Sequence, residues 1–143
     1  MSWAQVFDAY DETDLIAICD LDGEKRDQAR ELLGVESLCE SFDEFLDDER
    51  IDAIALFTPA PLHAEQSIKA IKAGKHVLCA VPAVMDMAEA KSLVEVASQS
   101  DRIYMMAENW VYEPAAVRAH ELYGDGAFGQ IYYAEAEYYH GVQ

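Results

Sequence analysis

The chain has 143 residues, of which 52% are hydrophobic and 27% charged, a composition typical of a globular domain with a hydrophobic core. Its 28 acidic and 10 basic residues give a net charge of −18, which argues against binding to nucleic acid or to an anionic membrane surface. The sequence holds no apolar run near the roughly 20 residues that a membrane-spanning helix needs, and no signal peptide is visible. We therefore expect a cytoplasmic protein with no membrane partner.

Three cysteines are present, at Cys19, Cys39 and Cys79. They form no C-x-x-C pair and have no metal-like spacing with the histidines. Two of them lie inside apolar runs, where cysteine usually behaves as a small buried side chain. We predict a reduced intracellular protein without a disulfide or a bound metal.

The first half of the chain alternates between helix-like and strand-like patterns. Residues 2–9 suit a short helix, and the apolar run 15–19 suits a strand covered on both faces, ending at Asp20. Asp22 is a helix-capping residue before 24–33, and Gly34 is typical of the position after a helix. A short extended piece follows near 35–39, and Ser41 begins a capping box for a short helix to about Asp48.

The second half repeats the alternation with longer helices. Strands are predicted at 51–57, 76–81 and 103–107, and helices at 61–73, 86–99 and 114–123. Residues 130–139 alternate between two faces and are predicted to be a half-buried strand of a different kind. The pattern predicts a doubly wound parallel sheet of the Rossmann type over 1–123, with 124–143 as the start of a second, α+β domain.

Asp20 closes the first predicted strand of the chain, where a dinucleotide-binding fold places an acidic residue. In such a fold a first strand and a G-x-G-x-x-G loop come earlier, so we expect both to belong just before Met1. Asp20 would then accept hydrogen bonds from the adenosine ribose, and its charge would favour NAD over NADP. The alternative is that Asp20 only ends a strand.

Four strings of residues then follow in order: Thr-Pro-Ala-Pro-Leu-His at 58–63, Ala-Gly-Lys-His-Val-Leu-Cys-Ala-Val-Pro at 73–82, Tyr-Met-Met-Ala-Glu-Asn at 104–109, and Gly-Ala-Phe-Gly-Gln-Ile-Tyr-Tyr-Ala-Glu-Ala-Glu-Tyr-Tyr-His at 126–140. Their succession resembles the Gfo/Idh/MocA family of sugar and inositol oxidoreductases. The resemblance implies an NAD(P)-binding domain, hydride transfer to or from a sugar-like alcohol carbon, and a homo-oligomeric full-length protein.

The resemblance also suggests site residues. It implies that Thr58, Pro59, His63 and Pro82 lie beside the cofactor, although His63 could equally be a buried residue at a helix start. Where the family has Glu-Lys-Pro, this chain has Ala80, Val81 and Pro82, so the lysine that assists proton transfer is replaced by valine.

The substrate-side candidates are Asn109, Trp110, Tyr112 and His140. Val111 stands where an arginine is common in the family. Trp110 and Tyr112 could stack on a sugar ring or cover the core, and His140 could be structural.

Two functions remain open from the sequence. The first is an NAD(P)-dependent oxidoreductase acting on a sugar-like or polyol substrate and present here as a fragment. The second is a non-catalytic ligand-sensing or assembly protein of the same fold, which has lost the lysine. An upstream glycine motif and a downstream Asp/His pair would favour the first.

Overall fold

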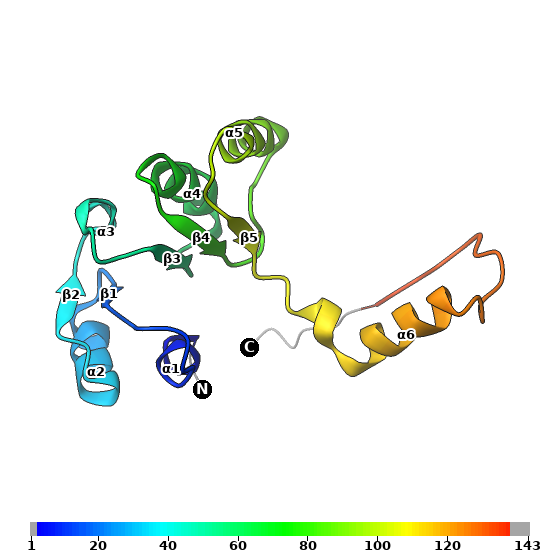
Figure 1. Ribbon diagram of the computed structural model, residues 1–143, viewed down its shortest axis with the longest axis horizontal. Helices are drawn as coiled ribbons and strands as arrows, with labels where there is room; N and C mark the ends of the chain where they lie inside the picture. The colour runs from blue at the N-terminus through cyan, green and yellow to red at the C-terminus, as the bar shows by residue number, and fades with distance from the viewer. Residues whose placement is uncertain (1–2, 138–143) are drawn as a thin grey trace. The chain divides into compact units, whose positions relative to one another are not determined.

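The computed structural model describes residues 3–137 and shows strands and helices in alternation (Figure 1). The elements in chain order are α1 (Trp3–Asp8), β1 (Ala17–Cys19), α2 (Gly23–Leu33), β2 (Ser37–Cys39), α3 (Asp43–Asp47), β3 (Ala53–Leu56), the 3-10 turn η1 (Ala60–Leu62), α4 (His63–Lys72), β4 (His76–Cys79), α5 (Met87–Ser98), β5 (Tyr104–Met106), the 3-10 turn η2 (Trp110–Tyr112) and α6 (Pro114–Gly124). No helix among them is both long and apolar enough to cross a membrane.

The chain divides into two compact units, Met1–Ala107 and Glu108–Gln143. All strand pairs of the first unit are parallel: β1 pairs with β2, and β3, β4 and β5 form a second sheet in that order. Parallel neighbours joined by helices are what the alternating pattern predicts. The predicted parallel α/β fold is therefore confirmed.

Polar residues define the ends of the helices as the sequence predicts. The Asp22 carboxylate accepts the Glu24 amide at 2.9 Å, and Gly34 ends α2 in the left-handed region with φ 67°. Asp86 accepts the amides of Ala88 and Glu89 at 2.8 and 2.9 Å. The Glu89 carboxylate in turn accepts a hydrogen bond from the main-chain amide of Met85, one residue before the cap, whereas in a regular capping box it would bond the amide of the cap residue itself.

The core of the first unit lies between the β3–β4–β5 sheet and helices α4 and α5 (Figure 1). Its buried members are Ile51, Ile54, Leu56, Ala70, Ile71, Val77, Cys79 and Leu93. Along β3 the residues alternate: Ile54 and Leu56 are buried, whereas Ala53 and Ala55 are exposed. The sequence predicts an apolar strand over 51–57, but only one face of β3 is buried, because α4 and α5 cover that face.

The far side of β3 has a smaller cover. Trp3 of α1 stacks on Phe57, which directly follows β3, with ring centroids 5.3 Å apart. Within residues 3–107, no ladder hydrogen bonds join β1 to β3, although Ile16 and Ala17 pack against the core cluster. Each of these two strands therefore has one edge with unpaired main-chain groups in the part of the chain that the structure describes.

The second unit contains η2 and α6, and no strand follows α6 in the described residues up to 137. Residues 131–137 are exposed and adopt no regular secondary structure, whereas the alternation predicted a strand over 130–139. A strand needs a neighbour to supply its hydrogen bonds, and alternation cannot say whether that neighbour is present. Residues 138 and 139 lie outside the described residues.

Candidate cofactor site

Four of the predicted cofactor residues lie within three residues after strands of the first unit. Asp20 follows β1, Thr58 and Pro59 follow β3, and Pro82 follows β4. In parallel α/β sheets, ligands bind at the carboxyl ends of the strands. These residues therefore lie at strand ends of the kind where parallel α/β proteins bind ligands.

The Asp20 side chain is held in one orientation by its own turn. Its Oδ1 accepts the main-chain amide of Asp22 at 2.9 Å, while its Oδ2 lies 3.9 Å from Nζ of Lys25. The side chain remains partly exposed. Oδ2 makes no hydrogen bond within the described residues, so this oxygen can accept a hydrogen bond from a hydroxyl group of a ligand.

Arg26 fixes the main chain at the same point. Its Nη1 donates to the carbonyl oxygen of Asp20 at 2.7 Å, and its Nη2 forms an ion pair with the Glu40 carboxylate, which follows β2. The Arg26 side chain is mostly buried, whereas that of Glu40 is exposed. Sequence reasoning missed this pair; the available signal was a basic residue in the first turn of the helix after Asp20.

His63 joins the loops that follow β3 and β4. Its Nε2 lies 2.7 Å from the carbonyl oxygen of Thr58, and its Nδ1 lies 2.7 Å from the carbonyl oxygen of Pro82. The Thr58 hydroxyl donates to Oε1 of Gln66 at 2.6 Å, a contact that the sequence analysis also missed. Gln66 is three residues after His63 on α4, and this helical spacing could have indicated it.

Val81 occupies the loop after β4, immediately before Pro82, and the peptide bond between them is cis. Its side chain is 46% exposed and has no ionisable group. The loop therefore has an open position where the family resemblance expects a lysine. Proton transfer at that position would need a group from elsewhere.

The substrate-side candidates belong to the second unit. Asn109 precedes η2, its carbonyl accepts the Tyr112 amide at 3.1 Å, and the Trp110 amide donates to the Glu108 carboxylate at 3.0 Å. Trp110 and Tyr112 are both exposed. These three residues are thus brought together on one turn, whereas His140 lies outside the described residues.

The two cysteine thiols near Asp20 have raised pKa values. Burial raises the pKa of Cys19, and the neighbouring Cys39, Glu44 and Asp20 raise it further. Burial likewise raises the pKa of Cys39. All three cysteines are free, and within residues 3–137 no group of three or more His, Cys, Asp or Glu side chains could hold a metal ion.

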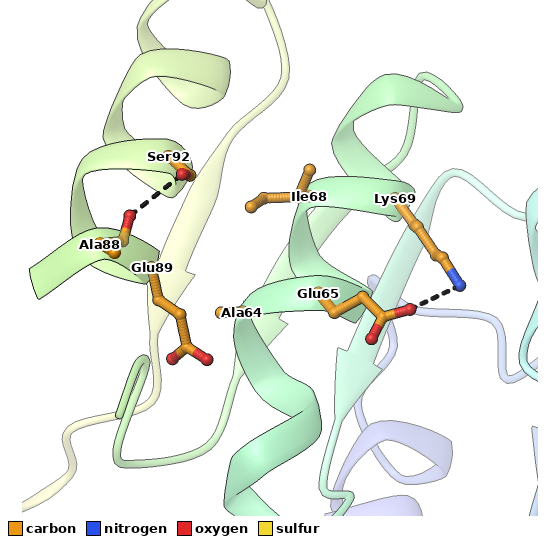
Figure 2. A pocket seen from close by; sticks show the side chains of 7 residues that line it. All are labelled: Ala64, Glu65, Ile68, Lys69, Ala88, Glu89 and Ser92. Atoms are coloured by element: carbon orange, nitrogen blue, oxygen red, sulfur yellow. Dashed lines mark hydrogen bonds and ion pairs between the residues drawn. The ribbon is translucent and has the colours of Figure 1, made fainter. Parts of the chain in front are cut away.

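A groove of about 390 Å³ lies between the first turns of α4 and α5 (Figure 2). Its polar lining residues are already engaged: Glu65 pairs with Lys69 at 2.8 Å, Ser92 donates to the Ala88 carbonyl, and Glu89 accepts the Met85 amide. Figure 2 shows Ile68 and Ala64 between these groups. A ligand there would find few polar partners to orient it, so we do not place the site in this groove.

Comparison with known proteins decides the family. The oxidoreductase family with an NAD-binding Rossmann fold, Gfo/Idh/MocA, matches residues 1–108. The chain belongs to this family. Its fold is accordingly that of an NAD(P)-binding domain.

Two curated relatives show how much sequence this chain shares with characterised proteins. A levoglucosan dehydrogenase of Pseudarthrobacter phenanthrenivorans is 31% identical over 104 residues, which are 73% of this chain and 27% of that protein. A glycosyl hydrolase family 109 protein of Porphyromonas gingivalis is 27% identical over 140 residues, 92% of this chain and 30% of that protein. The chain thus spans less than a third of the length of either relative.

Solved structures of Gfo/Idh/MocA proteins share the architecture. Scyllo-inositol dehydrogenase from Lactobacillus casei, with bound NAD(H) and scyllo-inositol, has a TM-score of 0.84 at 25% identity, covering 88% of this chain and 38% of that one. A 3-ketoreductase from Actinomadura kijaniata, in complex with TDP-benzene and NADP, has a TM-score of 0.76 at 27% identity, covering 86% and 39%. One neighbour thus holds NAD(H) and the other NADP, so the fold alone does not decide between the two cofactors.

Proposed function

We propose that the chain is part of the cofactor domain of an NAD(P)-dependent oxidoreductase that acts on a sugar-like or polyol substrate. The proposal rests on the Asp20 carboxylate, held at the end of β1 with its Oδ2 accepting no hydrogen bond within the described residues. A carboxylate in this place fits the two adjacent hydroxyls of an adenosine ribose. Sugar and polyol names among the relatives support the substrate class.

We propose NAD as the preferred cofactor. A 2′-phosphate would meet the negative charge of Asp20, which repels it. Arg26, the buried cation nearby, already donates to the Asp20 carbonyl and pairs with the Glu40 carboxylate, so its positive charge is not free to neutralise a 2′-phosphate. Lys25 is the remaining cation near the carboxylate, and it is 3.9 Å from Oδ2. The local balance of charge supports NAD over NADP.

The other predicted residues would orient the cofactor. We assign Thr58, Pro59 and Pro82 to the loops beside its nicotinamide half, with His63 beneath them. Bound NAD would supply the hydride acceptor, while the protein would hold it against the substrate. Because Val81 cannot move a proton, we assign the acid/base group to another part of the full protein.

The remaining assignments rest on the resemblance. The proposed substrate-side residues are Asn109, Trp110, Tyr112 and His140. The proposed division places residues 1–123 in the cofactor domain and residues 124–143 at the start of a second domain. We expect the full protein to act in the cytoplasm as a homo-oligomer.

The test is hydride transfer by the product of the complete natural reading frame that contains this chain. Purified protein is incubated with NAD or NADP and a panel of aldoses, anhydrosugars and inositols, and formation of the reduced nicotinamide is followed by absorbance. Turnover with at least one of these alcohols and NAD is expected. Cofactor binding without turnover on any of them would contradict the proposed activity.

A second candidate function is a non-catalytic sensing or assembly protein of the same fold. It is favoured by one observation, the exposed Val81 in place of the lysine. Val81→Lys distinguishes the two: if the natural protein is inactive and the variant gains turnover, the chain is a sensor that lost a catalytic group. If the natural protein is active and the substitution leaves the rate and pH profile unchanged, the proton moves elsewhere.

A further inference from the structure

His63 is a buried side chain between two main-chain acceptors. It is the first residue of α4, its side chain is 2% exposed, and it is among the largest fully buried side chains of the described residues. Each ring nitrogen lies 2.7 Å from one carbonyl oxygen, that of Thr58 or that of Pro82. Both distances are those of short hydrogen bonds.

The chemistry of the two partners determines what the ring must supply. A carbonyl oxygen can only accept, so each ring nitrogen has to donate an N–H. A neutral imidazole has one N–H and one lone pair, and the lone pair would face the second carbonyl oxygen at 2.7 Å. Only the imidazolium form, with a proton on both nitrogens, satisfies both contacts.

The other charges near the ring do not remove the need for a proton on both nitrogens. The positive end of the α4 dipole opposes a cation at the first helical residue. Against it stand two charge-assisted hydrogen bonds, which are the stronger kind. The charged residues of α4 near this end, Glu65 and Lys69, pair with each other at 2.8 Å on the surface. The two carbonyl groups therefore decide the protonation state of the ring.

We propose that His63 is a positioning residue, whose doubly protonated ring binds the Thr58 and Pro82 carbonyls and so fixes the spacing of the two loops at the carboxyl ends of β3 and β4. β3 and β4 are neighbours in the sheet. With both nitrogens occupied and the ring buried, His63 has no group left to contact a ligand. Its role toward the cofactor, which rests on the proposed function, is to hold the loops that would touch it.

The first test is the protonation state itself. The chain is produced in its natural reading frame with 15N-labelled histidine rings, and the ring nitrogen shifts are recorded at about pH 7.5, where an ordinary imidazole is mostly neutral. His76 is the internal control, because its Nδ1 accepts the Ile103 amide at 2.9 Å and so cannot hold a proton. We expect two protonated nitrogens for His63 and an unprotonated Nδ1 for His76. An unprotonated nitrogen in His63 would overturn the proposal.

The second test separates positioning from stability. His63→Gln keeps one amide donor group and His63→Leu keeps none, while Ile71→Val weakens the same helix's core packing without touching the loops. For NAD affinity, measured by calorimetry, we expect a small loss in His63→Gln, a loss of about tenfold or more in His63→Leu, and none in Ile71→Val. Unchanged affinity in His63→Leu would refute the positioning role. If the natural protein binds no NAD, the proposed function fails, and the ring shifts still decide the proposal about His63.

Discussion

Arg26 holds the main chain of Asp20: its guanidinium Nη1 lies 2.7 Å from the Asp20 carbonyl oxygen. The same guanidinium pairs with Glu40, so one side chain joins the carboxyl ends of β1 and β2. Hydrogen bonds from a charged donor are stronger than neutral ones. The carboxylate proposed to bind the ribose thus stands on a main chain that a second residue fixes.

Arg26→Ala should therefore weaken both folding and cofactor binding. Loss of the charged hydrogen bond is expected to lower the free energy of unfolding by about 1–2 kcal/mol, measured by urea denaturation, and to weaken NAD binding. Arg30→Ala is the control, because Arg30 forms an exposed ion pair with Asp27 at 3.6 Å. Equal effects of the two substitutions would contradict the role given to Arg26.

Lys75 is a buried cation with a structural role. Its side chain is 7% exposed, and Nζ donates to the carbonyl oxygens of Asp48 and Ile51 at 2.7 and 2.8 Å. Lys75→Met removes both bonds and leaves two carbonyls without a donor, at a cost of about 2–3 kcal/mol. Lys72→Met, at an exposed position of α4, should change thermal unfolding little. Similar melting temperatures for the two variants would show that Lys75 is not needed to hold this loop.

Tyr104 should make the protein sensitive to alkali. Its buried hydroxyl has no hydrogen-bond partner among the described residues, and burial is the main cause that raises its pKa. Because the pKa of Tyr104 is higher in the folded than in the unfolded state, its neutral hydroxyl contributes stability to the fold. This contribution is fully present below about pH 10 and is lost as the pH rises further.

Tyr104→Phe should remove that alkaline loss and cost little stability at neutral pH, because the hydroxyl it deletes is unsatisfied. The measurement is the free energy of unfolding from pH 7 to 11, with Tyr123→Phe, on the exposed surface of α6, as the control. An unchanged alkaline profile in Tyr104→Phe would show that another group controls it.

Polypeptide 1–143, made by itself, should bind NAD weakly or not at all. In the described residues β1 and β3 are not joined by ladder hydrogen bonds, so the sheet that should carry the cofactor is interrupted beside Asp20. The comparison is a calorimetric titration of this polypeptide against the product of the complete natural reading frame. Micromolar affinity of both for NAD would contradict the expectation.

Much of the fold could be predicted because each element carries its own local signal. Asp22, Asp86 and Gly34 set helix ends through interactions with their nearest neighbours in the chain. The predictions that were wrong concerned features that depend on contacts between residues distant in sequence. The one-sided burial of β3 depends on which helices cover the sheet, and 130–137 forms no strand because alternation does not supply a neighbour.

In the candidate site, too, features set by local sequence could be predicted, whereas contacts between distant residues could not. The places of Asp20 and Thr58 after strands could be predicted, because each is the first polar residue after an apolar run. The link from Arg26 to Glu40 crosses 14 residues, and that from His63 to Pro82 crosses 19. Local spacing does not identify the partner in such contacts, since they form only once parallel strands bring their carboxyl ends to one edge.

The most direct measurement is a calorimetric titration of the complete natural protein with NAD and with NADP, in the wild type and in Asp20→Asn. Asparagine keeps the oxygen that accepts the Asp22 amide and removes the charge. Asp27→Asn, on the exposed face of α2, is the control. We expect the wild type to prefer NAD by about tenfold or more and Asp20→Asn alone to lose this preference. Tighter binding of NADP, or an unchanged preference in Asp20→Asn, would contradict this expectation.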